Sequence, residues 1–338
     1  MAGTIRRIVL ARPIAGAPSA DDFRLEEAPI PDLADGQFLI RTVSCSVDPG
    51  TRSRLGGAAS YAAALKPGEI IDGFNIGQVA TSRNEKYAVG EVLALGGGWA
   101  DHVVSNGRGY IQRIPRTDIP LSAWIGVLGV PGMTAWFGLH RVAQMKAGET
   151  VLVTSAAGPV GATAGQIARL CGARAIGVAG GPIKCAWVKN EARFDEVIDY
   201  KSQEFSEGLK AACEGGVDVL FDNVGAAMIE RILPIMKRGG RIVVSGQVAD
   251  YNNPSPPGIA GLHHFITARL RMEGLVVFDD LRQFPEAQTQ VANWISGGAL
   301  TYREEMFVGL ESAPAAFAGL FSGESFGRRI VRVGADPN

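Results

Sequence analysis

After residue 149 the sequence alternates regularly between short apolar runs and segments of helical character. The apolar runs are rich in valine, isoleucine and leucine and read VLVTS, RAIGVAG, EVIDY, VDVLFDNV, RIVVSG and RMEGLVVF. Such runs are typical of strands that are buried on both faces of a sheet. Strands that alternate with helices predict βαβ units, and six of them make a complete doubly wound parallel dinucleotide-binding domain. We expect the intervening helices at 159–171, 184–194, 205–213 and 227–239.

The first part of the chain predicts a different, β-rich domain. Its short runs IRRIVLAR, QFLIRTVSCSV, GQVATS and EVLALGG are separated by Gly, Pro, Asp and Asn, as strands and turns should be. We expect a loop over 48–61 and helical structure over 120–145 that Pro131 either breaks or starts anew. The final run RRIVRVG predicts a strand that returns to this first domain. The expected division is a β-domain of 1–125 and 300–338 with an inserted α/β domain of 126–299.

The composition excludes several classes of protein. With 33 basic and 34 acidic residues the formal net charge is −1, which gives no general electrostatic footprint for nucleic acid or an anionic membrane. The longest apolar stretch, Trp124–Val130, is too short to span a bilayer, and the first residues do not look like a signal peptide. The four cysteines form no CxxC pair. We expect a reduced cytoplasmic protein with no nucleic-acid or membrane partner.

The run VLVTS is followed by a glycine-containing turn and a helix. A dinucleotide fingerprint has the form G-x-G-x-x-G, and here Ala156 takes the first glycine position while Gly158 and Gly161 take the other two. Gly158 would let the pyrophosphate approach the backbone, and Gly161 would let the helix pack closely on the strand. Pro159 suits the first helical turn, whose free N–H groups would face the pyrophosphate. A tight turn in any α/β protein has a similar pattern, but the βα units that follow favour a nucleotide site.

The end of the second apolar run bears on the choice between NAD and NADP. An NAD site usually places Asp or Glu there, about 20 residues beyond the glycine turn, to bind the ribose 2′-hydroxyl. This run ends in Gly180-Gly181-Pro182, the next acid is Glu191, and the first charged residue is Lys184. Because a 2′-phosphate needs a cation and no carboxylate, the sequence favours NADP. An ordinary solvated lysine is the alternative interpretation of Lys184.

Longer motifs extend over essentially the whole chain. They read SVDPGTRSR, LGVPGMTAWFGL, AAGPVGATAGQIAR, AGGPIKCAW, IDYKSQ, FDNVG, SGQVADYN and FGRRIVRV. With these motifs the sequence resembles the zinc-free branch of the medium-chain dehydrogenase/reductase superfamily, and within it the NADP-dependent alkenal double-bond reductases, prostaglandin reductases and curcumin reductases. The resemblance implies a GroES-like β-domain, an inserted Rossmann domain, NADP(H) in the cleft between them, and a homodimer that often forms by pairing of the Rossmann sheets.

The same resemblance implies a set of site residues. The matching cofactor residues are Gly158, Pro159, Val160 and Gly161 at the pyrophosphate turn, Gly180, Lys184 and Tyr200 around the 2′-phosphate, Asn223, Ser245, Gly246, Gln247 and Val248 at the strand ends, Met133 and Thr134 near the nicotinamide, Phe278 at the cleft, and Ser325. Tyr251 matches a tyrosine beside the substrate carbonyl and the nicotinamide ribose. Tyr251 and Phe278 would also line the substrate pocket.

Two departures from the family pattern concern the site. Many relatives carry a tyrosine in the pocket where this chain has Gly50, so the pocket would be wider or the substrate different, and Tyr61 in the same loop could compensate. The family asparagine near the C-terminal motif is replaced by Ser325, whose shorter side chain would reach less far toward the cofactor.

We expect no metal. The G-H-E motif and the cysteine cluster of metal-using relatives are absent, and the matching place reads Ile71-Asp72-Gly73-Phe74-Asn75. His102 and His140 stand alone in the sequence, and adjacent residues such as His263 and His264 point apart on a helix, which makes them poor joint ligands. Zinc needs three or four ligands within reach.

The expected reaction is the reduction of the C=C bond of an α,β-unsaturated ketone or aldehyde. Hydride would reach the β-carbon, and Tyr251 would stabilise the enolate oxygen that forms. A tyrosine that only packs over the cofactor is the alternative role. Two other functions stay open, a quinone reductase on the same scaffold and an NADPH-binding protein without catalysis, because fold alone does not decide function.

Overall fold

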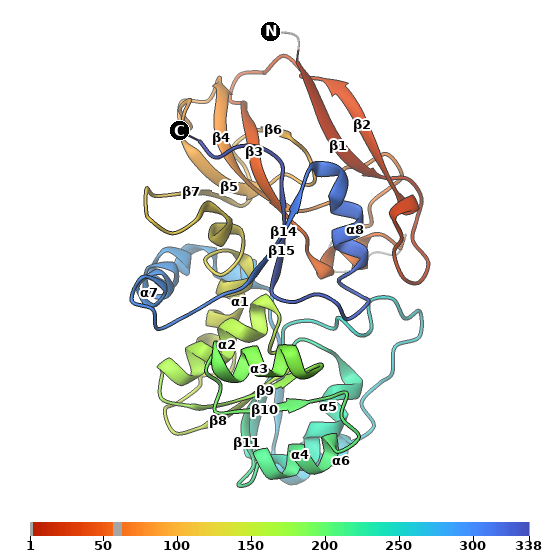
Figure 1. The fold of residues 1–338 in the computed structure, drawn as a ribbon, viewed down its shortest axis with the longest axis vertical. Coiled ribbons are helices and arrows are strands. Elements are labelled where there is room, and N and C mark those ends of the chain that lie inside the picture. The colour runs from red at the N-terminus through yellow and green to blue at the C-terminus, as the bar shows by residue number, and fades with distance from the viewer. Residues whose placement is uncertain (1–2, 57–62, 338) are drawn as a thin grey trace. The chain divides into compact units, whose positions relative to one another are not determined.

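The computed structural model describes residues 3–56 and 63–337 (Figure 1). The chain divides into two compact units. Unit 1 consists of Met1–Ile125 and Glu304–Asn338, and unit 2 consists of Gly126–Arg303. No helix among the described residues combines the length and the apolar character that crossing a membrane requires.

Unit 1 is built from antiparallel strands and short helices. Its larger sheet has the order β14-β15-β3-β4-β5-β7, with β6 paired to β3, and β1 pairs with β2 in a separate sheet. The strands are β1 Thr4–Leu10, β2 Phe23–Pro29, β3 Phe38–Ser46, β4 Phe74–Ser82, β5 Val92–Gly96, β6 His102–Ser105, β7 Ile111–Arg113, β14 Glu304–Val308 and β15 Arg328–Arg332. The helices are the 3-10 helices η1 Ala20–Asp22, η2 Pro49–Arg54, η3 Leu121–Ile125 and η7 Leu310–Ser312, and α8 Ala313–Ala318.

The core of unit 1 joins segments that are far apart in the sequence. The rings of Phe23, Trp99 and Phe317 pack on one another with centroid distances between 5.6 and 5.9 Å. Strand β15 pairs antiparallel with β3 and parallel with β14, so the end of the chain forms part of the first sheet. The packing of Phe23, Trp99 and Phe317 buries aromatic surface from both sequence segments of unit 1. It therefore holds these two segments together, although unit 2 is inserted between them in the sequence.

Unit 2 contains a six-stranded sheet in the order β10-β9-β8-β11-β12-β13, and every neighbouring pair is parallel. The order reverses between β8 and β11, which is where doubly wound sheets bind their ligands. The strands are β8 Thr150–Val153, β9 Arg174–Ala179, β10 Glu196–Asp199, β11 Val217–Asp222, β12 Met236–Val244 and β13 Arg271–Gly274. The predicted Rossmann arrangement is confirmed.

The helices of unit 2 connect these strands and cover the sheet (Figure 1). They are α1 Val130–Phe137, the π-helical turn η4 Gly138–Val142, α2 Pro159–Leu170, α3 Pro182–Asn190, α4 Phe205–Ala212, α5 Ala226–Ile232, α6 Leu262–Ala268 and α7 Phe284–Ser296, with 3-10 turns η5 Leu233–Ile235 and η6 Val277–Gln283. Helix α1 begins at Val130, so Pro131 lies at a helix start, where the missing N–H costs nothing.

Three predicted segments differ from the structure. The expected helix over 227–239 ends early, because strand β12 already begins at Met236, after Pro234 has interrupted the helical pattern. The expected strand RMEGLVVF stops at Gly274, and its last residues enter the 3-10 turn η6. The expected loop over 48–61, of which 57–61 lie outside the described residues, contains the 3-10 helix Pro49–Arg54. Short apolar runs do not by themselves distinguish strands from turns of helix.

Candidate dinucleotide site

The turn after β8 brings a strand end and a helix start into close contact. Ser155 has a φ of 52°, and its carbonyl oxygen accepts a hydrogen bond of 2.9 Å from the Gly158 N–H. A Cβ added at Gly161 would lie only 2.3 Å from that carbonyl oxygen, and one at Gly158 would lie 3.1 Å from the Ser155 hydroxyl. Helix α2 begins directly afterwards with Pro159, so its first N–H groups have no helical partner. Glycine is therefore required at Gly161, and free N–H groups at a helix start are the kind of arrangement that can bind an anionic group.

A second set of contacts lies where β9 and β10 end. Gly180 follows β9, and a Cβ at Gly180 would lie 2.6 Å from a ring carbon of Tyr200. Tyr200 follows β10 and is 43% exposed. Lys184 lies in the first turn of α3. The structure thus brings Gly180 and Tyr200 together and places Lys184 in the first turn of the helix that follows Gly181.

A carboxylate from the third strand also lies at this turn, although the second strand itself carries no acid at its end. Asp199, the last residue of β10, accepts hydrogen bonds of 2.9 Å from the Gly181 and Lys201 N–H groups. It comes from the neighbouring strand rather than from the strand that precedes the turn. Asp199 reaches the turn because β10 pairs in parallel with β9, so that the carboxyl ends of the two strands meet.

The ends of β8 and β11 are joined by polar side chains. The Asn223 N–H donates to the Thr154 hydroxyl and its side-chain amide donates to the Thr154 carbonyl, each at 2.8 Å. The Thr154 hydroxyl donates to the Asp222 carboxylate at 2.7 Å, and the Gly225 N–H donates to the other Asp222 oxygen at 2.8 Å. Burial raises the pKa of Asp222 to about 6, although these hydrogen bonds oppose the shift. Sequence analysis identified Asn223 but missed Asp222, an acid at the end of a buried strand.

The segment after β12 lies against this corner. The Ser245 N–H donates to the Asp222 carbonyl at 2.8 Å, and the Val248 N–H donates to the Asn223 carbonyl at 3.2 Å. A Cβ at Gly246 would lie 3.8 Å from the Tyr251 hydroxyl oxygen. The predicted residues Asn223, Gly246 and Tyr251 are therefore neighbours at the carboxyl ends of β11 and β12.

The other residues predicted in unit 2 lie in two helical segments. Met133 and Thr134 are buried in α1, and the Thr134 hydroxyl donates to the Val130 carbonyl at 2.7 Å. Phe278 lies in η6 and is 38% exposed. Gln247 is exposed, whereas Ser245 and Val248 are half-buried.

The loop of unit 1 that carries Gly50 is fixed by charged side chains. Arg328 in β15 donates to Asp48 at 2.7 Å and also donates to the carbonyl groups of Val47 and Ile125. Arg52 donates to the Ile14 carbonyl at 3.1 Å and to the Gly16 carbonyl at 2.8 Å. Sequence analysis missed these arginines as structural anchors.

Gly50 itself lies in the 3-10 helix η2, whose backbone suits any residue, and its carbonyl accepts a hydrogen bond of 2.8 Å from the Ser53 hydroxyl. A second ion pair joins Arg54 to Asp72. Ser325 is half-buried in the segment before β15. Tyr61 lies outside the described residues, so its predicted compensation for Gly50 stays a prediction.

The comparisons with known proteins agree over the full length of the chain. Two family models match, one described as the N-terminal domain of oxidoreductase over 6–112 and one described as zinc-binding dehydrogenase over 159–294. The NADPH-dependent curcumin reductase of Escherichia coli (strain K12) is 37% identical, with 98% of this chain and 97% of that protein covered. The chain belongs to the medium-chain dehydrogenase/reductase superfamily.

Further relatives specify the group within this superfamily. The NADP(+)-dependent 2-alkenal reductase of Nicotiana tabacum is 35% identical, with 97% of each chain covered. The crystal structure of CurA from Vibrio vulnificus in complex with NADPH superposes with a TM-score of 0.92 at 37% identity, covering 98% of this chain and 100% of that one. The chain thus belongs with the double-bond reductases of the medium-chain superfamily.

The histidines and cysteines of this reductase do not converge. His102 lies 3.0 Å from the Asp101 carboxylate, His140 packs on Trp136, and His263 and His264 lie against each other. Within the described part of the chain, no group of three or more His, Cys, Asp or Glu side chains could hold a metal ion. Burial raises the pKa of the Cys45 thiol to about 12 and that of Cys213 to about 11, so both thiols are protonated.

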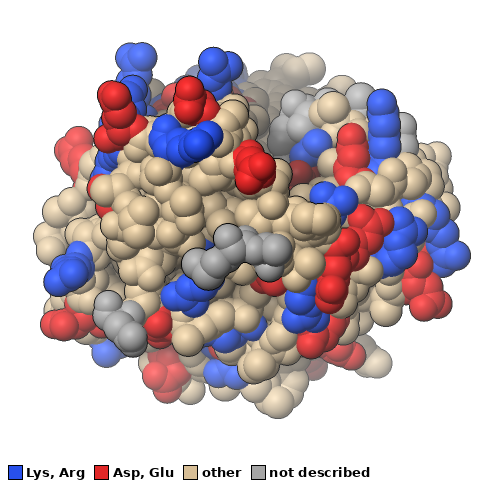
Figure 2. All heavy atoms as spheres, turned by 90° about the horizontal axis from the view of Figure 1, so that it is seen from above, with Lys and Arg blue, Asp and Glu red and all other residues tan. Residues whose placement is uncertain are grey.

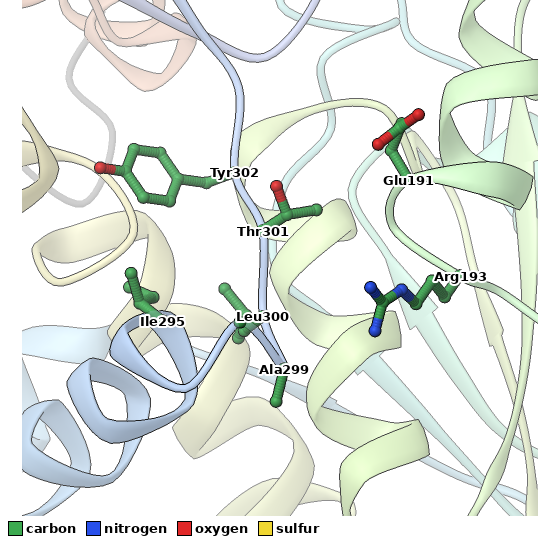
Figure 3. Close-up of a pocket in the computed structure, with 8 residues that line it drawn as sticks. Glu191, Arg193, Ile295, Ala299, Leu300, Thr301 and Tyr302 are labelled. Atoms are coloured by element: carbon green, nitrogen blue, oxygen red, sulfur yellow. The ribbon is translucent and has the colours of Figure 1, made fainter.

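In the view of Figure 2, basic and acidic side chains are interspersed around a broad area without charged residues. A surface pocket of about 360 Å³ lies beside the C-terminal end of α3 (Figure 3). Glu191 and Arg193 contribute from the turn after α3, and the remaining side chains come from the end of α7 and the segment that follows it. None of the predicted site residues lines this pocket.

Proposed function

We propose that this protein reduces the C=C bond of α,β-unsaturated ketones or aldehydes with NADPH. The observation that carries the proposal is the corner where the Tyr251 hydroxyl lies near Gly246 and Asn223, at the carboxyl ends of the parallel strands. The glycine turn at Gly158 and Gly161 fits a dinucleotide, because a Cβ at Gly161 would collide with the Ser155 carbonyl and displace the backbone that the pyrophosphate would approach. The full-length likeness to NADPH-dependent reductases of enones and alkenals supports the same function.

In the proposed site each part of unit 2 has one task. The turn Gly158–Gly161, which includes Pro159 and Val160, would hold the pyrophosphate, and Gly180, Lys184 and Tyr200 would hold the phosphorylated ribose of the adenosine. Asn223 and the segment Ser245–Val248 would line the nicotinamide half, together with Met133, Thr134 and Phe278. In unit 1, Gly50 would line the substrate pocket and Ser325 would contact the cofactor.

When bound, NADPH supplies the hydride for the β-carbon of the substrate. The protein must then stabilise the negative charge that develops on the carbonyl oxygen, and the Tyr251 hydroxyl is the group we assign to donate a hydrogen bond to it. A donor that is already oriented in the site needs no reorganisation during the reaction. Protonation of the α-carbon completes the saturated carbonyl product.

We also propose a homodimer that forms through the edge of the unit 2 sheet, in a cytoplasmic enzyme that works without a resident zinc ion. Strand β13 is one of the two edge strands of this sheet, and its residues Arg271–Gly274 are all exposed. Apolar side chains near this edge are also exposed, namely Leu262, Ile266, Met272 and Val276. An unpaired edge with apolar side chains is suited to pairing with a second copy. Light scattering of the intact protein tests this, and a monomer would contradict it.

The test of the activity is a turnover assay with a panel of substrates. An aliphatic 2-alkenal, an aryl enone, a diarylheptanoid such as curcumin and a quinone are each supplied with NADPH and, separately, with NADH. We expect saturated carbonyl products from the enones, and we expect Tyr251→Phe to lower kcat by about 100-fold, as removal of one oxyanion donor does, while NADPH binding stays unchanged. Turnover of the quinone alone would support a quinone reductase instead. Binding without any turnover would support a protein without catalysis.

A further inference from the structure

Asp199 lies beside the turn that would hold the adenosine ribose. It is the last residue of β10, and its register partner in β9 is Ala179, the residue directly before Gly180. The two strands run parallel, so Asp199 and the β9–α3 turn share the carboxyl edge of the sheet. This is the edge where a doubly wound sheet binds its nucleotide.

The hydrogen bonds of Asp199 leave one oxygen available. Its Oδ1 accepts the N–H groups of Gly181 and Lys201, both at 2.9 Å, and this fixes the carboxylate to the turn. No described residue donates a hydrogen bond to its Oδ2. A carboxylate oxygen with spare acceptor capacity can accept a hydrogen bond from a ribose 2′-hydroxyl.

The negative charge of Asp199 acts on a residue in the first turn of α3. The pKa of the Cys185 thiol is raised to about 11, mainly by burial and further by the charge of Asp199. Lys184, the cation that would meet a 2′-phosphate, is the neighbour of Cys185 in the same turn. The negative charge of Asp199 and the positive charge of Lys184 would thus both act on the 2′ position of the adenosine ribose. This position carries a phosphate in NADP and a hydroxyl in NAD.

We propose that Asp199 sets the ratio in which this protein binds NADPH and NADH. Its carboxylate repels the 2′-phosphate and partly offsets the attraction of Lys184, while it offers a hydrogen-bond acceptor to the 2′-hydroxyl of NADH. The inference rests on the proposed function only in that the site binds a nicotinamide nucleotide. It predicts a smaller preference for NADPH than Lys184 alone would give.

The test compares dissociation constants of NADPH and NADH, measured by the fluorescence of the bound reduced nucleotide with the full chain. The variant Asp199→Asn keeps an amide oxygen that can accept the two N–H groups, so the turn should remain in place. We expect the ratio of the NADH to the NADPH dissociation constant to rise about tenfold in this variant, because one repulsive charge and one acceptor are lost. Unchanged melting temperatures would show that the fold is intact.

Glu196→Gln serves as the matched control, since it removes the same charge from the first residue of the same strand, where Glu196 pairs with Lys189 at 3.5 Å. We expect no change in the ratio for this control. An equal change of both constants in Asp199→Asn, or no change, would overturn the inference. Failure of the wild-type protein to bind either nucleotide would instead refute the proposed cofactor, and selective binding without enone turnover would refute only the proposed reaction.

Discussion

The glycine turn of unit 2 and the η2 loop of unit 1 both follow a buried strand, but different forces hold them in place. The turn after β8 is shaped by backbone contacts so close that a Cβ at Gly161 would lie 2.3 Å from a carbonyl oxygen. The η2 loop is held by guanidinium groups, with Arg328 on Asp48 and Arg52 on the carbonyls of Ile14 and Gly16. The first segment depends on the absence of side chains and the second on their presence.

This difference determines what each segment tolerates. A backbone contact cannot be repaired by another residue, because any L-amino acid other than glycine carries the Cβ that collides. A charged contact can be replaced by another donor of similar reach, but loss of one partner leaves the other charge buried without compensation. We therefore expect substitutions in the glycine turn of unit 2 to weaken nucleotide binding. Substitutions of the arginines that hold the η2 loop should instead lower the stability of unit 1.

The largest expected effect is that of Arg328→Leu. The side chain of Arg328 is 4% exposed and that of Asp48 is 19% exposed, so the change leaves a carboxylate largely buried without its partner. We expect the free energy of unfolding to fall by about 3–5 kcal/mol, as for other buried pairs that lose one member. Urea unfolding measures this change in the free energy of unfolding. Arg328→Lys retains one cation and should lose less, and a loss below about 1 kcal/mol for leucine would show that the pair is dispensable.

The second expected effect is that of Gly161→Ala on nucleotide binding. To make room for the methyl group the Ser155 carbonyl or the start of α2 must move, which displaces the proposed pyrophosphate cradle. We expect the NADPH dissociation constant to rise by about 100-fold, which corresponds to about 2.8 kcal/mol of lost binding free energy. Gly96→Ala is the control, because no atom lies within 4 Å of a Cβ there. Equal affinity in the two variants would contradict the assignment of the turn.

Much of unit 2 could be predicted because its signals are local. The valine- and isoleucine-rich runs and the turn Gly158–Gly161 lie within short windows, and the strands β8 to β11 follow them closely. The prediction was wrong at Met236, where a strand replaces the expected end of a helix, and after Gly274, where a 3-10 turn replaces a strand. Both errors lie at element boundaries, where a few residues satisfy either pattern.

The anchors of unit 1 could not be predicted in the same way because they are not local. Arg328 and its acceptor Val47 are 281 residues apart. The only signal in the sequence is a pair of arginines inside an apolar strand, RRIVR, which must find partners if buried. Asp199 was missed for a related reason, since its contact with the turn arises from the pairing of two strands.

The substitution Asp222→Asn tests whether the stability of unit 2 depends only on backbone contacts or also on a buried side chain. Its carboxylate is fully buried, and burial, with a smaller effect of the Asp250 charge, raises its pKa to about 6 from the ordinary 3.8. Between these values the folded state binds more protons than the unfolded state, so this group makes stability fall as pH rises from about 4 to 6. We expect Asp222→Asn to remove this fall, which is on the order of 1–3 kcal/mol.

Urea unfolding of both proteins at pH 4.5 and pH 7 measures the difference for Asp222. The comparison of variant with wild type at each pH cancels the opposite effect of the carboxyl groups whose pKa is lowered, such as Asp22 beside Arg12 and Ser19. Parallel pH profiles for the two proteins would show that Asp222 keeps its ordinary pKa. Loss of NADPH binding at pH 7 in the variant would show that the Thr154–Asp222 contact also shapes the site.

The smallest expected effect is that of Gly50→Tyr on substrate choice. Gly50 lies in a 3-10 helix, so a larger side chain is compatible with the backbone, and the arginine anchors keep the loop in place. A ring at this position would narrow the proposed pocket, and we expect the KM for a diaryl enone to rise by about 5- to 10-fold while that for a short 2-alkenal changes little, in line with the 1–3 kcal/mol that a small steric change in a pocket is worth. Gly50→Ala, which adds one methyl group, should leave both KM values near wild type. If the ring raised both KM values equally, Gly50 would not line the part of the pocket that distinguishes large from small substrates, and the departure from the family tyrosine would have no bearing on selectivity.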